Sequence, residues 1–214
     1  MPFLSTFAAA AAKSFGLTAS TITGALKDLY FNIVSLLVNA EPVLTPITND
    51  ESANNFDIAA IADAKASLFS PYQGHGYYSV QFNGSTDNLT VAQTFGLPTS
   101  TTPFTMEAWV YVLTYAGCAI ASTSYAGGGA IPFVLGMGNT STAGGDAGQY
   151  PFLNYYNGSA WATGVKSTVP VTQHTWSHIA GVFDGTNAKI YVNGVLGGTW
   201  ASGTWQTTGQ ANFY

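Results

Sequence analysis

The sequence contains no arginine and little charge of either sign. Its 214 residues include 5 basic side chains, all of them lysine, and 10 acidic ones, so the formal net charge is -5. Nucleic-acid binding depends on a basic surface that neutralises phosphate groups. We therefore expect no nucleic-acid partner.

Charged residues make up only 7% of the chain, whereas hydrophobic residues make up 47%. Ordinary soluble proteins carry about 25% charged residues. A surface with so few charges must be built from Ser, Thr, Asn, Gln and Gly. This composition is more typical of an extracellular protein or a particle component than of a cytosolic enzyme.

Cysteine is also scarce, since Cys118 is the only one and lies in the small, apolar stretch 116–121. A single cysteine cannot form an internal disulfide, so the fold must be held together by its core. We expect Cys118 to be a small buried hydrophobic residue. A role as a catalytic nucleophile is the weaker alternative.

No apolar run approaches the ~18 residues that a membrane-spanning helix needs, so we expect no membrane insertion. The start of the chain nevertheless differs from the rest, because residues 7–15 read FAAAAAKSF and predict a short helix ending near Gly16. A floppy terminus and a signal peptide are the alternatives, although Lys13 interrupts the apolar stretch. We interpret residues 1–28 as a partly helical arm that becomes ordered when it docks on a partner.

Two turn signals divide the segment 176–200 into three strands. The apolar run 178–183 ends at Asp184-Gly185, and the run 189–192 ends at Asn193-Gly194. Asn-Gly between apolar runs is the strongest short hairpin signal, because a type I′ turn needs positive φ at both central residues. The segment is therefore predicted to be an antiparallel meander.

Other apolar runs predict further strands. Residues 104–113 alternate regularly, and because both faces carry large side chains we expect a strand in the centre of its sheet. The β-branched and aromatic run 29–38 predicts a buried strand, followed by a long surface loop at 39–55. The remaining predicted strands begin at 54–58, cover 131–135, and form a hairpin of 150–156 and 161–166 around Asn157-Gly158.

Three motifs, in this order, resemble the laminin-G-like, concanavalin A-like jelly-roll family. They are YSVQFNGSTDNLTV at 78–91, FTMEAWVYV at 104–112, and WSHIAGVFDG followed by KIYVNG within 176–194. The resemblance implies an all-β fold, an antiparallel β-sandwich jelly roll, and we assign this domain to residues 29–214. In the family, two more strands follow a stretch like 211–214. We therefore expect a domain that lacks its last strands and an open sheet edge, completed by a longer chain or a neighbouring subunit.

An upstream order of motifs resembles repeats in tail-fibre and other structural proteins of bacteriophages. It consists of SANNFDI at 52–58, FSPY at 69–72 and the motif at 78–91, although residues 36–40 read LLVNA where those repeats usually continue as LLLHG. The resemblance implies a virion structural protein, such as a tail fibre or appendage. Its partners would be other virion proteins, bound through residues 1–28, and further copies of the chain, for example in a trimer.

His174 and His178 invite a metal-site interpretation. On a strand, however, four residues span ~13 Å at 3.3 Å each, which is too far for two bonds to one zinc ion. We expect surface or hydrogen-bonded histidines.

Glycoside hydrolases of the concanavalin-like class carry E-x-D-x-E on one strand, but here Glu107 is followed by Ala108 and Trp109. We expect no enzyme activity, with Glu107 in a structural role.

Asp87 and Asn88 match the place where pentraxin-like relatives bind calcium. In those relatives, the further oxygen ligands needed for 6–8 coordination follow the strand at which this chain ends. We therefore prefer to interpret Asp87 and Asn88 as a turn between strands, and we expect no cofactor.

Tyr155, Tyr156 and Trp161 lie near a predicted hairpin tip and are candidates for binding glycan. The sequence thus predicts a virion jelly roll that serves as a spacer or as a binder of host glycans. The alternative is a secreted, extracellular adhesin or lectin.

Overall fold

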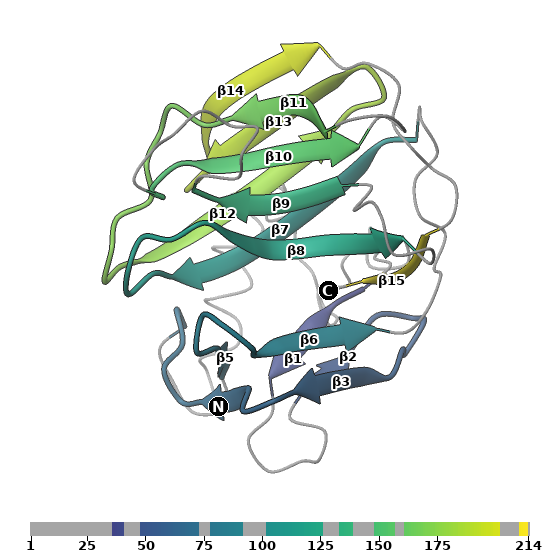
Figure 1. Cartoon of the computed structure of the whole chain (residues 1–214), viewed down its shortest axis with the longest axis vertical. Helices are drawn as coiled ribbons and strands as arrows, with labels where there is room; N and C mark the ends of the chain where they lie inside the picture. The colour runs from purple at the N-terminus through teal and green to yellow at the C-terminus, as the bar shows by residue number, and fades with distance from the viewer. Residues whose placement is uncertain are drawn as a thin grey trace, which may run out of the picture.

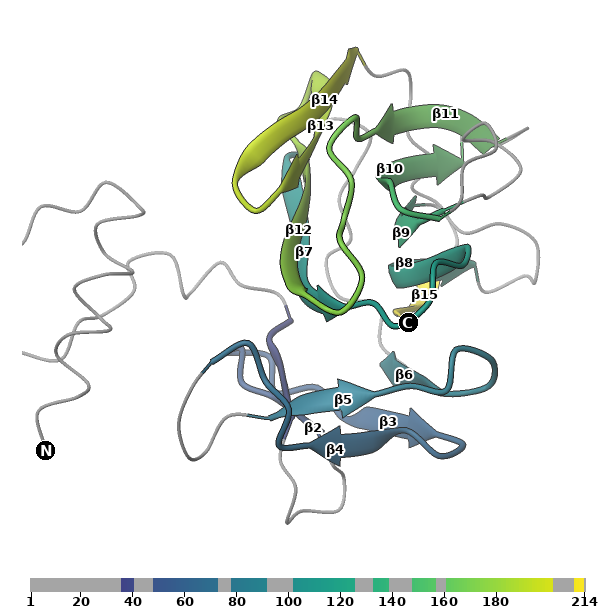
Figure 2. The ribbon, with the colours of Figure 1, turned by 90° about the vertical axis from the view of Figure 1, so that its left-hand side faces the viewer.

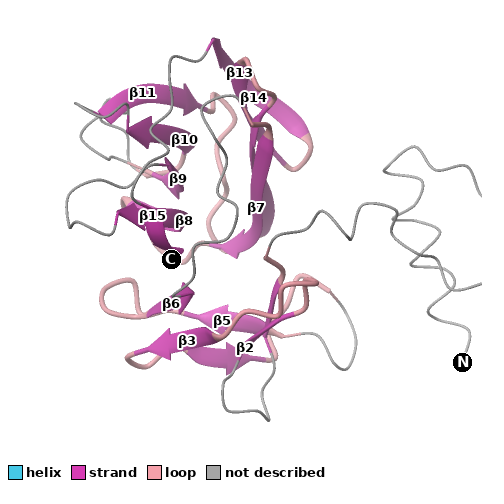
Figure 3. Ribbon diagram, turned by 90° about the vertical axis from the view of Figure 1, so that its right-hand side faces the viewer, coloured by secondary structure: helices cyan, strands magenta, loops and turns pink. Residues whose placement is uncertain are grey.

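The structure is a computed structural model that describes residues 36–40, 48–72, 78–91, 102–125, 133–138, 148–156, 161–201 and 210–213. Within these ranges the regular elements are all strands (Figure 3), and no helix is long and apolar enough to cross a membrane. The described strands are β1 (Val38–Ala40), β2 (Thr48–Asp50), β3 (Ile58–Ile61), β4 (Lys65–Ser67), β5 (Ser79–Gln81), β6 (Asn88–Val91), β7 (Phe104–Tyr111), β8 (Cys118–Tyr125), β9 (Phe133–Met137), β10 (Pro151–Tyr156), β11 (Trp161–Lys166), β12 (Trp176–Phe183), β13 (Asn187–Val192), β14 (Val195–Ala201) and β15 (Gln210–Phe213).

Two sheets pack against each other as the layers of a sandwich (Figures 1 and 2). One sheet has the strand order β11-β10-β9-β8-β15-β6-β3, and the other has the order β14-β13-β12-β7. The described strand pairs are antiparallel. Two short hairpins, β1-β2 and β4-β5, lie near the β3 end of the larger sheet. The predicted antiparallel β-sandwich is confirmed.

The hydrophobic core fills the space between the two sheets. Ile179, Phe183 and Ile190 of the smaller sheet belong to one buried cluster with Leu135 and Leu153 of the larger sheet. Each of these five side chains is at most 1% exposed. Full burial of such a side chain stabilises a fold by about 1.5–3 kcal/mol, so this cluster contributes strongly to stability.

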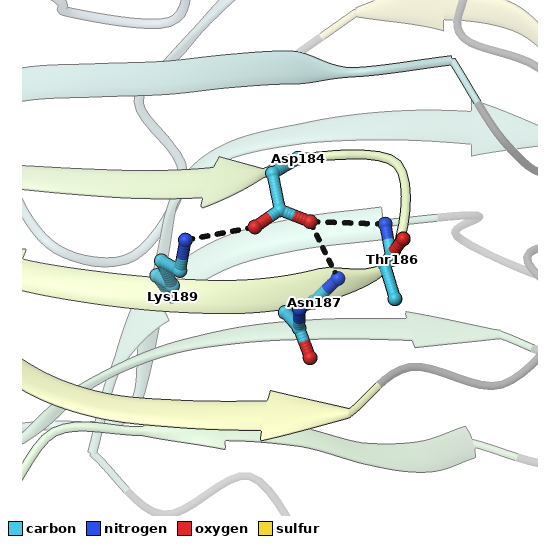
Figure 4. Close-up of polar contacts among 4 residues, drawn as sticks. All are labelled: Asp184, Thr186, Asn187 and Lys189. Carbon is cyan, nitrogen blue, oxygen red and sulfur yellow. Dashed lines mark hydrogen bonds and ion pairs between the residues drawn. The ribbon is translucent and has the colours of Figure 1, made fainter.

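The predicted meander is present as β12, β13 and β14. Asn193 and Gly194 both have positive φ, 50° and 78°, as a type I′ turn requires. At the preceding turn the Asp184 carboxylate accepts hydrogen bonds from the backbone N–H groups of Thr186 (3.0 Å) and Asn187 (2.7 Å), and from Lys189 Nζ (2.7 Å), as Figure 4 shows. Both turns are thus built from local signals that the sequence carries.

The strand near the end of the chain lies inside the larger sheet, where β15 is paired with β8 on one side and β6 on the other. No local pattern encodes this long-range pairing. The open sheet edge that we expected from missing strands stays a prediction. The absence of the family's last strands stays a prediction, as do the assigned domain limits, and the arm at residues 1–28 lies outside the described residues.

Other strand predictions need correction. β7 is at the end of the described four-stranded sheet and not in its centre. Its large outward side chains are instead partly covered by the segment 68–72, because Phe69 contacts Tyr111. The motif at 78–91, whose counterpart in the family resembled here is a pair of strands, forms two strands with other partners: β5 pairs with β4, and β6 pairs with β3.

The predictions for the first strand and the following loop are wrong in the part that is described. Leu37 and Val38 are 40% and 43% exposed, so the run is not a buried strand there. The supposed loop at 39–55 contains β2, which pairs with β1. The apolar composition of the run misled the prediction, because this hairpin contributes no described side chain to the main core cluster.

Candidate functional site

The outward face of the β7–β12 pair carries aromatic rings, an imidazole and a carboxylate. The register places Tyr111 opposite Trp176, Trp109 opposite His178, and Glu107 opposite Ala180. Directly opposed residues project from the same face of a sheet. The intervening residues point into the core, so one strand pair supplies both a core face and an outward face.

Aromatic rings from three segments meet on this outward face. Trp109 lies 5.3 Å from His178 and 6.1 Å from Tyr72, measured between ring centroids. Phe69 stands edge-on to Tyr111 at 4.5 Å and stacks on Trp176 at 5.4 Å. Edge-to-face and offset-stacked geometries like these are the ones that the ring quadrupoles favour. We call this set the outer aromatic face; it comprises Phe69, Tyr72, Trp109, Tyr111, His174, Trp176 and His178.

Solvent reaches part of the outer aromatic face. Trp109 is 44% exposed, and Phe69 and Tyr72 are exposed as well. In contrast, the indole N–H of Trp176 is buried and has no hydrogen-bond acceptor within the described residues. Large exposed aromatic side chains gathered on one sheet face commonly mark an interaction surface.

One carboxylate belongs to the same face. Glu107 Oε2 lies 3.5 Å from His178 Nε2, and the Glu107 side chain is 61% exposed. This contact is an ion pair only when His178 is protonated, and at such exposure it contributes at most about 1 kcal/mol to stability. The structure therefore leaves the Glu107 carboxylate accessible beside the rings of Trp109 and His178.

The two histidines contact aromatic rings. His174 is not on a strand as predicted, because it precedes β12 in a left-handed conformation (φ 57°) that lets its N–H bond to the Val112 carbonyl at 2.9 Å. Its ring contacts Tyr111, whereas His178 contacts Trp109 and Glu107. Among the described residues, no three His, Cys, Asp or Glu side chains are grouped to hold a metal ion.

The candidate calcium residues form a turn. Asp87 accepts hydrogen bonds from the backbone N–H groups of Asn83 (2.9 Å) and Asp63 (3.1 Å), one on each oxygen. The Asn88 side-chain oxygen accepts a bond from Thr90 Oγ1 at 3.0 Å. Asp87 thus closes the predicted turn ahead of β6, and calcium binding there, which needs 6–8 oxygen ligands, stays a prediction.

A second carboxylate, Asp50, is buried but also has a structural role. Its two oxygens accept bonds from the N–H groups of Leu37, Ser52 and Phe56 and from the Ser52 hydroxyl, at 2.8–2.9 Å. Burial opposes the charge, but these hydrogen bonds outweigh it and lower the pKa of Asp50. This carboxylate therefore ties β1 and β2 to the start of β3 and is not accessible to a ligand.

The other predicted residues are only partly described. Tyr156 and Trp161 are register partners on β10 and β11, and Tyr155 is paired with Ala162, but their side chains lie outside what is described. Their proposed glycan contacts stay a prediction.

Cys118, expected to be buried, is exposed. Partial desolvation nevertheless raises the pKa of its thiol, which disfavours the reactive thiolate.

The outer aromatic face was not predicted from the sequence. The regular alternation of 104–113 marked Glu107, Trp109 and Tyr111 as one face of a strand. The pairing of that face with His178 and Trp176 depends on contacts between segments about 70 residues apart, as the register gives them. No local pattern carries that information.

A family model described as the concanavalin A-like lectin/glucanases superfamily matches residues 83–214. The match includes both strands of the outer aromatic face, whereas Phe69 and Tyr72 precede it. A search of curated proteins found no match.

Solved structures share the fold at low sequence identity. The binding domain of botulinum neurotoxin serotype G has a TM-score of 0.57 at 14% identity, over 83% of this chain and 42% of that one. Domain 4 of AbnA, a GH43 extracellular arabinanase from Geobacillus stearothermophilus in complex with arabinotriose, has a TM-score of 0.52 at 17% identity, over 77% and 75%. The binding domain of Paraclostridial Mosquitocidal Protein 1 has a TM-score of 0.56 at 11% identity, over 84% and 48%. The chain thus spans less than half the length of the neurotoxin and Mosquitocidal Protein 1 structures, and these likenesses show the fold alone.

Proposed function

The chain belongs to the concanavalin A-like lectin/glucanases superfamily, and we propose that its domain binds carbohydrate without cleaving it. The observation that carries this proposal is the outer aromatic face, where an exposed tryptophan lies beside a carboxylate and an imidazole. Sugar rings present apolar C–H faces that pack on aromatic rings, and their hydroxyl groups donate hydrogen bonds to carboxylates. The face offers both kinds of contact within a few ångströms.

We propose that the domain does not cleave its carbohydrate ligand because Glu107 has no second carboxyl group beside it on β7 or β12. Glycoside hydrolases use two carboxyl groups about 5–9.5 Å apart. Glu107 is the only acidic residue on either β7 or β12. Of the other acidic groups described, Asp50 and Asp87 are held by backbone N–H groups in turns. Glu107 consequently acts as a hydrogen-bond acceptor and not as half of a catalytic pair.

The proposed setting is a virion appendage, such as a phage tail fibre, that presents the domain to glycans on a host surface. The order of motifs from 52 to 91, the low charge and the apolar sequence of residues 1–28 support it. In this setting residues 1–28 dock on other virion proteins, and several copies assemble, for example as a trimer. A secreted adhesin with the same binding face is the second candidate, favoured by the low charge alone.

Binding is tested on a glycan array with the full chain, followed by calorimetry on the retained glycans. Trp109→Ala is compared with Phe82→Ala, which removes another exposed aromatic side chain (46% exposed, against 44% for Trp109) that is not among the outer aromatic face residues. We expect Trp109→Ala to weaken binding at least tenfold and Phe82→Ala to leave it unchanged. A folded chain that retains no glycan would contradict the proposal.

Cleavage and setting need separate measurements. Each retained glycan is incubated with the chain while new reducing ends are counted; release that disappears in Glu107→Gln would show a hydrolase. Mass spectrometry of purified particles from the source tests the virion setting. Peptides from residues 1–28 in the particle support it, whereas a secreted protein with a cleaved leader would favour the adhesin.

A further inference from the structure

The outer aromatic face also limits which sugars it can hold. We propose that this face selects uncharged hexopyranose units, with Trp109 stacking on the sugar ring and Glu107 accepting hydrogen bonds from two neighbouring hydroxyl groups. This inference rests on the proposed function and adds the chemical class of the ligand. It follows from the charges on the four-stranded sheet.

The first step is the negative charge of Glu107. One of its oxygens lies 3.5 Å from His178 Nε2, while Oε1 makes no polar contact within the described residues. A carboxylate is an acceptor only, so it suits the O–H donors of a sugar and repels a second carboxylate. Hydrogen bonds to a charged group change binding roughly 10- to 100-fold.

The second step is that the positive charge of Lys189, the one lysine on the four-stranded sheet, is already paired. The register places Thr105, Val182 and Lys189 in a row across β7, β12 and β13, one row from Glu107. Lys189 Nζ, however, donates a 2.7 Å hydrogen bond to Asp184 (Figure 4). This contact lowers the pKa of Asp184 and raises that of Lys189, so both are charged at neutral pH and offset each other.

The other described lysines are not on this sheet, because Lys65 and Lys166 are on β4 and β11. While His178 is neutral, an acidic sugar would therefore meet Glu107 without a compensating charge from a residue of this sheet. Two unit charges ~5 Å apart in water disfavour binding about fourfold, and more where solvent is excluded.

The third step is the space beside Glu107. Ala180 is opposite Glu107 on β12, and Tyr191 is opposite Ala180 on β13. With strands about 4.8 Å apart, the backbones at Glu107 and Tyr191 are separated by roughly 10 Å. Ala180 is nevertheless only 8% exposed, so its small side chain is already covered, and a sugar ring has to lie on the exposed Trp109 ring beside Glu107.

The experiment compares matched neutral and acidic glycans on the full chain. The array carries neutral oligosaccharides such as lactose, cellotriose and maltotriose together with 3′-sialyllactose and trigalacturonate, and calorimetry gives Kd for each that is retained. We expect neutral probes to bind at least fourfold more tightly than acidic counterparts. Glu107→Gln should weaken neutral binding about tenfold or more and reduce that preference.

Glu51→Gln is the matched control. It removes the same charge from an exposed carboxylate outside the four-stranded sheet, where the Glu51 Oε1 atom accepts a 3.0 Å hydrogen bond from the Asn39 side chain. Its Kd values should equal those of the unchanged chain, and the melting temperatures of both variants should show that they are folded.

The outcomes separate this inference from the proposed function. Binding that prefers acidic glycans, or that Glu107→Gln leaves unchanged, overturns the inference while the proposed function stands. If Tyr156→Ala abolishes binding and Trp109→Ala does not, the binding site is on the β10–β11 hairpin. This result also overturns the inference and leaves the proposed function standing. If no glycan is retained at all, both fail.

Discussion

The inner and outer faces of the β7–β12 pair differ in almost every property, although they alternate along the same two strands. The inner face contributes Met106, Ile179 and Phe183 to the core, all nearly inaccessible to solvent. The outer face presents Trp109 and Glu107 to solvent. Alternate residues of these strands therefore have different roles: those on the inner face stabilise the fold, and those on the outer face are available for binding. Stability and binding can consequently be changed by different substitutions.

The largest expected effect comes from the inner face. Phe183 is 1% exposed and lies against Phe104, with ring centroids 5.8 Å apart. Phe183→Ala leaves a cavity in the core and should lower the free energy of unfolding by about 3–5 kcal/mol. Urea denaturation measures this change. A loss below about 1 kcal/mol would mean that the two sheets are not packed as described.

The meander turn should show an intermediate effect. Gly194 has φ +78° and no atom within 4 Å of the position that a Cβ would occupy, so any cost arises from the backbone alone. Gly194→Ala should therefore destabilise the fold by about 1–2 kcal/mol. Thermal unfolding of this variant beside Trp109→Ala gives the comparison. Equal melting temperatures for Gly194→Ala and the unchanged chain would rule out a left-handed conformation at this turn.

How much could be predicted from the sequence depends on whether a feature is local or joins distant segments. Turn chemistry at Asn193-Gly194 and alternation in 104–113 are local, and both were predicted correctly. The edge position of β7, the pairing of β15 with β8 and β6, and the meeting of Trp109 with His178 all depend on distant segments. Sequence periodicity shows which residues share a face, but it does not show what the face contacts.

A smaller effect is expected at the turn between β12 and β13, and it depends on pH. Lys189, with the N–H groups of Asn187 and Thr186, holds the pKa of Asp184 well below its usual range. A carboxyl group with a lowered folded-state pKa stabilises the fold fully above its unfolded pKa of about 4, and this contribution is lost as pH falls further. The melting temperatures of the unchanged chain and Asp184→Asn should therefore differ at pH 7 and converge toward pH 2. A constant difference across this range would contradict the assignment.

The smallest effect on folding is expected at the outer face. Trp109→Ala removes an exposed side chain from an edge strand of the described sheet, so the free energy of unfolding should fall by less than about 1 kcal/mol. Glycan binding should nevertheless fall at least tenfold, because the stacking surface is lost. Urea denaturation and calorimetry on the same preparation measure both quantities. A large loss of stability would show that Trp109 belongs to the core.

The most direct test of the central claim uses the five tryptophans of the chain, which include Trp109 and Trp176 on the outer face and Trp161 on the β10–β11 hairpin. Each indole N–H gives its own signal in a ¹⁵N-labelled NMR spectrum, assigned through single Trp→Phe variants. During titration with the tightest neutral oligosaccharide from the array, we predict that the Trp109 signal shifts while the Trp161 signal stays in place. A shift at Trp161 with Trp109 unchanged would contradict the account and place the binding site on the β10–β11 hairpin.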